Sequence, residues 1–515
     1  MSTDRIITAK LNDLLDGFVN ANGTYGVAAL AKTRVDISGV CLDSRLLVAG
    51  DVYLAMAGAS THGLLFIDAA IENGAVAVVT DDAGLDGYQS VLSEVLAAGI
   101  PVLHVSNLKS QASAIAARFY QHPSDDLQVV AVTGTDGKTS VCRFVANALN
   151  GLGQSCGYIG TLGWGLTTLS ETQLTTPDAV TIQRMMAVLR DEGATVVALE
   201  ASSHGLEEGR LDAVNIDVAV LTNFGRDHLD YHESLSAYKN AKARLFDWPD
   251  LRFVVLNGED ELGIELAEKT QVARVMFFAK NNSAEVSQHK PEICIQADSV
   301  ELHQQGLRFN LLDNGERFEQ NSSLMGSFNV ENLLACHGAL RALGQAANDA
   351  SASLSKISSV PGRIEQFNGV DKPTAIVDYA HTPQALTAVI EAVRQHCEGE
   401  LWVVFGCGGD RDPGKRGPMG EAAEQADHIV VTDDNPRTEQ SQAILDQIVS
   451  GMRNPERAIV IADRGNAIDH ALTNAASNDL VLVAGKGHED YQVVGTEKRD
   501  FSDRKTVQRF MQEAS

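Results

Sequence analysis

The sequence predicts an α/β protein built from several domains, each with a parallel β-sheet. Apolar runs such as VVAV (129–132), VVAL (196–199) and VAVL (218–221) are continuous rather than alternating, which is typical of strands that helices cover on both faces. Polar or glycine-rich turns follow these runs and lead into helix-like segments. At 515 residues the chain is too long for a single hydrophobic core.

Three domains are expected, divided where the composition changes. Residues 1–125 are predicted to form the first domain, because residues 39–80 alternate strand-like and helix-like pieces and a Pro-Asp-rich stretch, QHPSDD (121–126), suggests a boundary. Residues 126–359 are predicted to form a central domain with a P-loop-type parallel sheet. Residues 360–515, after the break at VPGR, are predicted to form a Rossmann-like domain. Its expected strands lie in TAIVDYAH, LWVVFGCGG, HIVVTDDN, RAIVIAD and LVLVAGKG.

Charge and composition exclude several classes of protein. A formal net charge of −27 argues against a nucleic-acid-binding protein, which would need a basic face. No apolar run approaches the roughly 18 residues that span a membrane, and the first residues lack a signal-peptide pattern. Seven scattered cysteines without a C-x-x-C pair suit reduced thiols. We therefore expect a cytoplasmic protein that binds neither nucleic acid nor membrane.

Polar and glycine-rich residues gather directly after the predicted strands. The carboxyl ends of parallel strands form the edge of the sheet where ligands bind, so these loops are candidates for a set of shared clefts. The loops are TGTDGKT (133–139), EASSHG (200–205), TNFGRDHLDYH (222–232), DYAHTP (378–383), GCGGDRDPGKRG (406–417), TDDNPR (432–437) and AGKGHED (484–490).

The first of these loops is a candidate phosphate site. A strand, a tight glycine turn and a helix start would present free amides and a positive dipole end to an anion. Lys138 would lie against the terminal phosphates, and the Thr139 hydroxyl could reach Mg²⁺. The loop is shorter by two residues than the usual G-x-x-x-x-G-K-[ST] pattern, so taken alone it is also compatible with a chance helix start. The residues assigned to nucleotide binding are Gly134, Thr135, Asp136, Gly137, Lys138, Thr139 and Ser140.

In combination, TGTDGKT, EASSHGL, TNFGRDHLDYH and NAKARLF resemble the Mur ligase family of ATP-dependent amide-bond synthetases, in which the short G-T-x-G-K-T loop is the normal form. Asp136 stands where that family more often has Asn. The loops DNPR, GGDRDPGKR and AGKGHEDYQ, with CLDSR (41–45), are similar to the branch that adds the third residue of the peptidoglycan stem peptide. The resemblance covers nearly the whole chain. It implies ATP-dependent joining of meso-2,6-diaminopimelate to UDP-N-acetylmuramoyl-L-alanyl-D-glutamate through an acyl phosphate, by a monomer.

The resemblance also implies a metal site. Thr139, Glu200 and His228 would hold Mg²⁺, and Lys242 would carry a carbamate that serves as a further oxygen ligand. His228 and His232 form an H-x-x-x-H pair, a spacing that also suits zinc, but hard oxygen donors favour magnesium. A lysine on a helix is ordinarily a solvated charge, and the family register is what singles out Lys242. The implied catalytic residues are Lys138, Glu200, His228 and Lys242.

The remaining site residues are likewise implied by the resemblance. ATP would be bound by Asn329, Arg363 and Asp378, with His381 lining the same cleft, although Asn329 also suits a helix N-cap. The UDP-sugar peptide would contact Leu42, Ser44, Ala59, Ser60, Thr61, Thr175, Thr176, Ser202, Glu208 and Arg210. Glu208 stands where relatives often carry Gln, and it would need Arg210 as a partner. Diaminopimelate would contact Arg411, Asp434, Asn435, Pro436, Arg437, Gly485 and Glu489.

Three alternatives remain at this point. Folylpolyglutamate synthetase is another ligase of the family, but it would lack the DNPR loop and the N-terminal domain. A P-loop phosphotransferase would pass phosphate to a small acceptor without forming an amide. A non-catalytic relative would keep the fold as a scaffold, against which the intact Lys138, Thr139, Glu200, His228 and Lys242 count.

Overall fold

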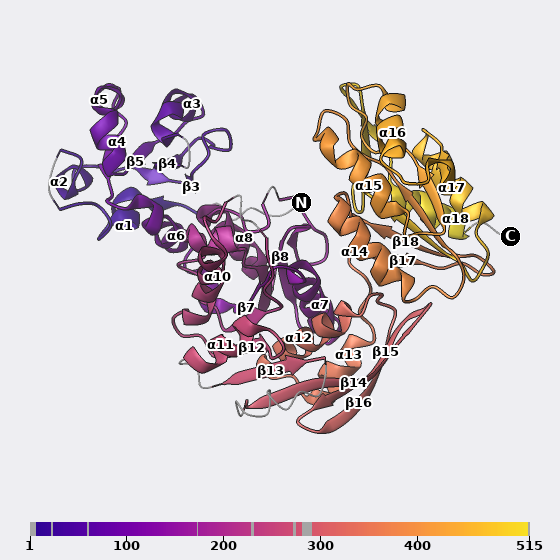
Figure 1. Cartoon of the computed structure of the whole chain (residues 1–515). Helices are drawn as coiled ribbons and strands as arrows, with labels where there is room; N and C mark the ends of the chain where they lie inside the picture. The colour runs from indigo at the N-terminus through magenta and orange to yellow at the C-terminus, as the bar shows by residue number, and fades with distance from the viewer. Residues whose placement is uncertain are drawn as a thin grey trace. The chain divides into compact units, whose positions relative to one another are not determined.

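The computed structural model confirms a mixed α/β chain with three main sheets (Figure 1). It divides into two compact units, one formed mainly by residues up to 277 and the other mainly by 293–337 and 345 onward. The predicted domain boundaries after residues 125 and 359 stay predictions. The structure describes residues 7–21, 24–58, 61–172, 174–227, 231–270, 274–280 and 291–512.

The N-terminal sheet has four parallel strands in the order β3-β4-β5-β6. Successive strand residues face opposite sides, and each side is covered by helices. Val52 and Leu54 pack with α1 and α6, whereas Tyr53 and Ala55 pack with α3 and α5. The elements are β3 (Gly39–Cys41), β4 (Asp51–Ala55), β5 (Ala77–Thr80), β6 (Val102–His104), α1 (Leu11–Leu15), α3 (Ile67–Glu72), α5 (Gln89–Ala97) and α6 (Leu108–Phe119).

The central sheet carries the predicted phosphate loop. Its parallel strands run in the order β12-β11-β7-β10-β8, and the short β9 lies antiparallel beside β8. The register places Glu200 beside Val132 and Leu221 beside Thr133, so three carboxyl strand ends meet at one edge. The strands are β7 (Gln128–Thr133), β8 (Cys156–Gly160), β9 (Gly163–Gly165), β10 (Val196–Glu200), β11 (Val218–Leu221), β12 (Phe253–Asn257) and β13 (Val275–Ala279). The helices are α7 (Lys138–Gly151), α8 (Ala179–Asp191), α9 (Ser203–Glu207), α10 (Leu235–Ala243) and α11 (Glu261–Lys269).

The second unit begins with an antiparallel module that the sequence reading missed. β14 (Ile293–His303), β15 (Gly306–Asp313) and β16 (Glu316–Ser322) pair in sequence order. Gly306 has a φ of 137°, and a Cβ atom there would lie 2.0 Å from Ser322 O, so the turn needs glycine. The helices α12 (Phe328–Ala342) and α13 (Ala347–Leu354) follow.

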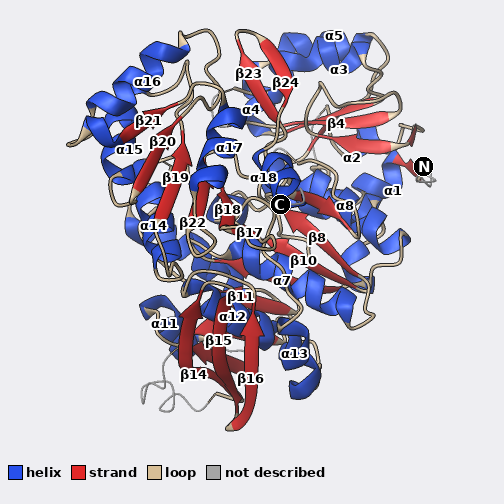
Figure 2. Cartoon of the chain, turned by 90° about the vertical axis from the view of Figure 1, so that its right-hand side faces the viewer, coloured by secondary structure: helices blue, strands red, loops and turns tan. Residues whose placement is uncertain are grey.

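The C-terminal sheet confirms the predicted parallel series. The strands run in the order β17-β18-β22-β19-β20-β21, and only the edge strand β17 is antiparallel. α14, α15 and α16 cover one face, while α17 and α18 cover the other (Figure 2). The strands are β17 (Glu365–Phe367), β18 (Thr374–Asp378), β19 (Leu401–Phe405), β20 (His428–Val431), β21 (Ala458–Val460) and β22 (Leu480–Ala484), followed by the hairpin β23 (Tyr491–Val494) and β24 (Glu497–Asp500). The helices are α14 (Pro383–Arg394), α15 (Arg416–Ala423), α16 (Ser441–Ser450), α17 (Arg464–Asn474) and α18 (Asp503–Gln512).

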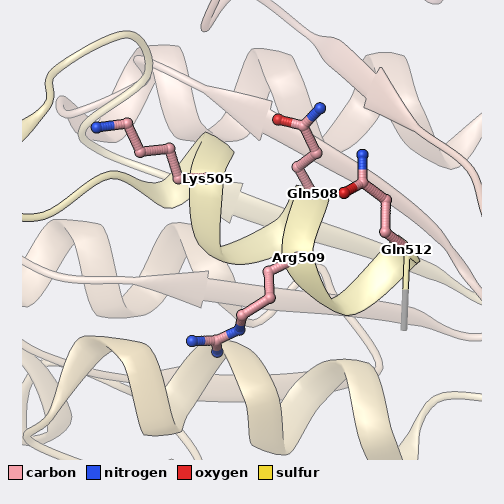
Figure 3. A pocket seen from close by; sticks show the side chains of 4 residues that line it. All are labelled: Lys505, Gln508, Arg509 and Gln512. Carbon is pink, nitrogen blue, oxygen red and sulfur yellow. The ribbon is translucent and has the colours of Figure 1, made fainter. Parts of the chain in front are cut away.

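Two further features are a hollow beside α18 and the length and polarity of the helices. A hollow in the second unit is lined by Lys505, Gln508, Arg509 and Gln512 of α18, none of which is a predicted site residue (Figure 3). Within the described part of the chain, every helix is too short or too polar to cross a membrane.

Candidate active site

The loop 134–139 connects β7 to the amino end of α7, as the sequence predicts. Gly134 and Gly137 have left-handed backbones, with φ values of 152° and 82°. A Cβ atom on Gly134 would lie 1.8 Å from Thr222 Oγ1, so the loop can pass this close to the end of β11 only with glycine. The Thr135 amide donates to Asn223 O over 2.9 Å and holds the turn in place. The turn presents the free amides of a 14-residue helix, a geometry that binds phosphate.

Lys138 lies over this loop. Its Nζ donates to the carbonyl oxygens of Gly134 and Thr135, at 2.9 and 2.8 Å. Burial lowers the pKa of Lys138, and the nearby carboxylates of Glu200 and Asp136 oppose that effect. The ammonium therefore sits at the helix start, where a terminal phosphate would supply the strongest counter-charge.

Asp136 is tied to the loop through its backbone. Its amide donates to Asn223 Oδ1 over 2.9 Å, and its carbonyl accepts from Thr222 Oγ1 over 2.5 Å. The residue is exposed, so its carboxylate does not lie in the protein interior. Thr139 and Ser140 are the next residues of α7 and are half-buried.

Glu200, the last residue of β10, is the centre of a buried hydrogen-bond cluster and is only 1% exposed. Its Oε1 accepts from the Tyr158 hydroxyl at 2.6 Å and from the Thr161 amide at 2.9 Å. Its Oε2 accepts from Thr139 Oγ1 at 2.8 Å and from Thr161 Oγ1 at 3.1 Å. The sequence reading found Thr139 and Glu200 but missed Tyr158 and Thr161.

The cluster has the donor chemistry that magnesium requires. The oxygens of Thr139, Thr161 and Glu200 converge beside the phosphate loop, and all are hard ligands. The predicted ligand His228 lies outside the described residues. Among the described residues, no three His, Cys, Asp or Glu side chains come together as a metal-binding group. The oxygen set would fit a magnesium ion.

Tyr158 sets the orientation of Glu200, and a phenylalanine there tests that role. Burial raises the pKa of Tyr158 most, and the negative charge of Glu200 raises it further. The hydroxyl therefore stays protonated and can donate its hydrogen bond to Glu200. Tyr158→Phe is expected to lower kcat about tenfold, because a hydrogen bond to a charged group contributes about 1.5–3 kcal/mol. The measurement is the steady-state rate of ADP release and the melting temperature. Tyr120→Phe, at another buried tyrosine, is the matched control and should leave kcat unchanged. An unaltered kcat in Tyr158→Phe would show that Glu200 needs no such support.

Lys242 is buried on α10, with a relative exposure of 1%. Its Nζ donates to Gly134 O over 2.6 Å and lies 4.4 Å from the centre of the Tyr238 ring. Burial, and next the positive charge of Lys138, lower the pKa of Lys242 to about 6. The side chain thus contacts the phosphate loop and is mostly an uncharged amine at neutral pH.

His232 has local partners. One ring nitrogen lies 3.0 Å from Ser203 Oγ, and the other lies 3.2 Å from a carboxylate oxygen of Glu207. These contacts join the segment before α10 to α9. His232 therefore has a structural role in the described part of the chain, and the zinc alternative gains no support from it.

Four residues predicted to hold the UDP-sugar peptide lie around Glu200. Thr175 Oγ1 is 3.0 Å from Thr161 Oγ1, and Thr176 Oγ1 donates to the backbone oxygen of Glu200 over 2.6 Å. Ser202 caps α9 by accepting from the Gly205 amide, and the Ser202 amide donates to Thr176 Oγ1 over 2.9 Å. The fourth, Arg210, donates to the backbone oxygen of Thr176 over 2.5 Å.

Glu208 and Arg210 form the pair that the sequence reading required. Two guanidinium nitrogens of Arg210 donate to Glu208 Oε2, at 2.9 and 2.7 Å. Burial has the largest single effect and would raise the pKa of Glu208, but the hydrogen bonds and charge of Arg210, the charge of Lys109 and the hydrogen bond from Tyr231 together hold the pKa below its ordinary value. Tyr231 adds a longer hydrogen bond of 3.3 Å. The negative charge of the Glu208 carboxylate is thus balanced by the guanidinium of Arg210.

In the N-terminal sheet the predicted residues follow β3 and β4. Leu42 is half-buried, and Ser44 is buried with its backbone oxygen accepting from Asn73 Nδ2 over 2.8 Å. Thr61 is exposed. Two further predicted residues of this group, Ala59 and Ser60, lie outside the described residues.

In the second unit, the residues predicted to bind ATP lie at the start of α12, just before β17, and at or after the end of β18. Asn329 lies in the first turn of α12, so it is not placed before the helix as an N-cap would be. Its side-chain nitrogen Nδ2 donates to Met325 O over 2.7 Å. The exposed Arg363 has its guanidinium 5.0 Å from the centre of the Tyr379 ring. His381 Nδ1 lies 2.8 Å from Tyr379 O.

Asp378 ends β18, and its carboxylate is held by the backbone. Ile364 and Ala380 donate their amides to its two oxygens, at 2.8 and 2.7 Å. Burial nevertheless raises the pKa of Asp378. The carboxylate is fixed in one orientation, as a ribose-binding acceptor would have to be.

Three residues predicted to bind diaminopimelate meet around one buried lysine that the sequence reading missed. Lys486 Nζ lies 3.4 Å from Asp434 Oδ1, 3.2 Å from Asn435 Oδ1 and 3.1 Å from Glu489 Oε2. Lys486 is fully buried. The sequence does not indicate this burial, because lysine side chains are usually exposed.

Arg437 is fixed in the same region. Its backbone has a φ of 50°, its amide donates to Val493 O over 3.0 Å, and its Nη1 donates to Gly409 O over 2.7 Å. Pro436 precedes it, and Gly485 has a φ of 123° at the end of β22. Arg411, another predicted contact, is exposed.

A phosphate loop, a buried oxygen cluster and carboxylates at the carboxyl ends of parallel strands define a nucleotide-dependent enzyme of several α/β domains. Three matches to models of known families identify the family within this class of enzymes. Residues 132–340 match the Mur ligase middle domain, 362–487 the Mur ligase glutamate ligase domain, and 36–120 the Mur ligase family catalytic domain. The chain belongs to the Mur ligase family, and it is an ATP-dependent amide ligase.

Three relatives of the chain within the family carry the same enzyme name. The chain is 44% identical over 470 residues to UDP-N-acetylmuramoyl-L-alanyl-D-glutamate--2,6-diaminopimelate ligase of Pseudomonas putida, with 91% of this chain and 93% of the relative covered. The Pseudomonas aeruginosa ligase of that name is 42% identical over 485 residues, with 93% and 96% covered. A solved structure of a ligase with the same name superposes with a TM-score of 0.68 at 34% identity, covering 92% of this chain and 94% of that one.

Proposed function

We propose that this enzyme joins meso-2,6-diaminopimelate to UDP-N-acetylmuramoyl-L-alanyl-D-glutamate, in the synthesis of peptidoglycan precursors. One observation carries the choice of amino acid. The side chains of Asp434, Asn435 and Glu489 surround the buried ammonium of Lys486, and Arg437 lies on the same loop as Asp434. A site with carboxylates and a guanidinium suits an amino acid whose far end bears both an ammonium and a carboxylate. The relatives that share 42–44% identity support the same activity.

The first step activates the D-glutamyl carboxylate. A carboxylate oxygen attacks the γ-phosphorus of ATP, the bond to the β–γ bridging oxygen breaks, and ADP leaves with the bond electrons. Phosphoryl transfer of this kind depends on positioning and neutralisation of charge. The amides of loop 134–139 and Lys138 would hold the phosphates, and Thr139, Glu200 and Thr161 would hold Mg²⁺, which neutralises phosphate charge when bound.

The second step forms the amide. The uncharged amino group of diaminopimelate attacks the acyl phosphate carbon, the resulting tetrahedral species expels phosphate, and the amine loses a proton. Thr175, Thr176, Ser202 and Arg210 would orient the peptide end of the substrate beside Glu200, consistent with their hydrogen bonds to one another and to that residue. No side chain is required as a covalent nucleophile.

Lys242 fits the proposed carbamate. A carbamate forms when an unprotonated amine attacks CO₂, and burial gives Lys242 a pKa of about 6. Its Nζ lies 2.6 Å from Gly134 O, so an anionic oxygen on that nitrogen would stand beside the phosphate loop. There it could serve as an additional hard ligand for magnesium. The cytoplasmic location and the monomeric state of the enzyme stay predictions.

One assay tests the proposed function against its alternatives. ADP release is measured with the UDP-muramoyl dipeptide and diaminopimelate, lysine or no amino acid, and separately with a folate and glutamate, and the amide product is followed by mass spectrometry. We expect stoichiometric ADP, phosphate and tripeptide with diaminopimelate. ADP without amide would indicate a phosphotransferase, glutamate addition to a folate would indicate folylpolyglutamate synthetase, and no turnover with any acceptor would indicate a scaffold.

Arg437 is expected to select diaminopimelate through its distal carboxylate. Lysine at this position keeps the charge but loses the planar fork that pairs with a carboxylate through two hydrogen bonds. We expect Arg437→Lys and Arg437→Ala to raise the KM for diaminopimelate about 10- to 100-fold, since such pairs contribute a few kcal/mol. The KM for ATP should stay nearly constant. Arg453→Ala, at an exposed arginine of the same domain, is the control. A native enzyme that incorporates lysine equally well would contradict this role.

A further inference from the structure

Lys486 is a buried cation that takes no part in the two proposed chemical steps. Its side chain is 0% exposed, whereas those of Asp434 and Glu489 remain 13% and 20% exposed. The ammonium therefore lies beneath the two carboxylates, on the side away from solvent. A lysine in the interior is costly unless opposite charges accompany it, and here two carboxylates do.

The lysine also organises the loops that carry these carboxylates. Asn435 Oδ1 accepts from Lys486 Nζ at 3.2 Å and from the Val493 amide at 2.9 Å, and Gln492 Nε2 donates to Asp434 O over 2.7 Å. These bonds link the loop after β20 to the loop after β22 and to β23. A displaced Lys486 would therefore affect both carboxylates together.

Neighbouring charges do not duplicate the effect of Lys486. Arg464 is also buried nearby, 3.7 Å from the position that a Cβ atom on Gly485 would take. Its guanidinium donates twice to Asp503, at 2.7 Å each, and both side chains are 0% exposed. This pair is neutral by itself. Lys486 Nζ thus lies within 3.4 Å of both carboxylates, and two further cations of the predicted site, Arg411 and Arg437, lie on the loops after β19 and β20.

We propose that Lys486 is a specificity-determining positioning residue, which balances the charge of Asp434 and Glu489 so that the amino-acid site accepts a zwitterionic side-chain end. This inference rests on the proposed function. The distal end of diaminopimelate carries one ammonium and one carboxylate, whereas lysine ends in an ammonium alone. Removal of the Lys486 charge makes the site more negative by one unit. The more negative site repels the distal carboxylate of diaminopimelate and favours the lone ammonium of lysine.

The test compares two amino acids on one enzyme preparation. Lys486→Gln keeps a hydrogen-bond donor without the charge, and Lys486→Met removes both. We expect the ratio of kcat/KM for diaminopimelate to that for lysine to fall at least about tenfold in either variant, because like charges brought together cost more than 1.4 kcal/mol. The KM for ATP should not change. Since the ratio does not depend on how much protein is folded, partial loss of folded Lys486→Met does not affect it.

Lys505→Gln is the matched control, because Lys505 is a lysine of the same domain whose side chain is 70% exposed on α18 (Figure 3). It should keep the native ratio. A native ratio in Lys486→Gln with a lowered one in Lys486→Met would overturn the charge argument, because hydrogen bonding alone would then explain the effect. Native ratios in both variants would overturn the inference and leave the proposed function standing. A native enzyme that ligates neither amino acid would overturn the proposed function itself.

Discussion

Replacement of Lys242 by alanine is expected to remove at least about 99% of the ligase activity, since a single lost group that stabilises transition-state charge costs about 10²- to 10³-fold. Burial lowers the pKa of Lys242 to about 6, so most of its amine is uncharged at pH 7.5 and can take up CO₂. Alanine cannot carry the resulting carbamate. The measurement is ADP release with all three substrates, with and without added acetate or bicarbonate.

A small anion should restore part of the activity of Lys242→Ala, because the vacated space beside Gly134 could hold a free carboxylate where the carbamate stood. Lys239→Ala is the control on the same helix, since Lys239 is 32% exposed and pairs with Glu265 at the surface. It should keep native activity and show no response to acetate. Undiminished activity in Lys242→Ala would remove the proposed role of Lys242.

The effect of pH follows from the same group and is separately measurable. The lysine must lose its proton before it reacts with CO₂, so the carbamate should be lost as the pH falls through about 6. Native activity should therefore fall on that acidic side, and excess bicarbonate should move the fall to lower pH. Activity that is constant between pH 7.5 and pH 5.5 would contradict an amine with this pKa.

The parallel sheets could be predicted because their strands are buried on both faces. Val129 to Val132 and Leu480 to Ala484 are continuous apolar runs, and each lies between layers of helices. The strands β14 to β16 were missed for the opposite reason. Their residues alternate between a buried and an exposed face, as in the sequence ICIQADSVELH of β14. They therefore form no continuous apolar run.

The candidate site could be predicted only where its chemistry is local in sequence. Gly134 to Thr139 stand together, so their spacing indicates a phosphate loop. Tyr158 and Thr161 could not be found in this way, since each gains its role from Glu200, about 40 positions away. The burial of Lys486 likewise depends on Asp434, which lies on another strand end. Such contacts arise from strand order, which the local pattern does not encode.

Replacement of Glu200 by glutamine should reduce the rate of ADP formation about 10²- to 10³-fold or more, for reasons of charge and of hydrogen bonding. All the described partners of its carboxylate are donors: the Tyr158 hydroxyl and the Thr161 amide on Oε1, and two threonine hydroxyls on Oε2. A glutamine can keep its oxygen against the Thr161 amide and place its NH₂ group against the two threonine hydroxyls, which must then turn from donors into acceptors. The hydroxyls are thereby reoriented, and the negative charge that would hold Mg²⁺ is lost.

The distinction between loss of charge and loss of structure decides how this variant is interpreted. If Glu200 holds magnesium, Glu200→Gln should raise the Mg²⁺ concentration that gives half-maximal rate, whereas a merely misfolded fraction would lower the rate at every concentration. Nucleotide binding measured by calorimetry without magnesium should change little. Glu192→Gln, an exposed glutamate that follows α8, should match the native enzyme in both measurements. A Glu200→Gln enzyme with the native magnesium dependence would assign Glu200 to packing, because its charge would then not contribute to the reaction.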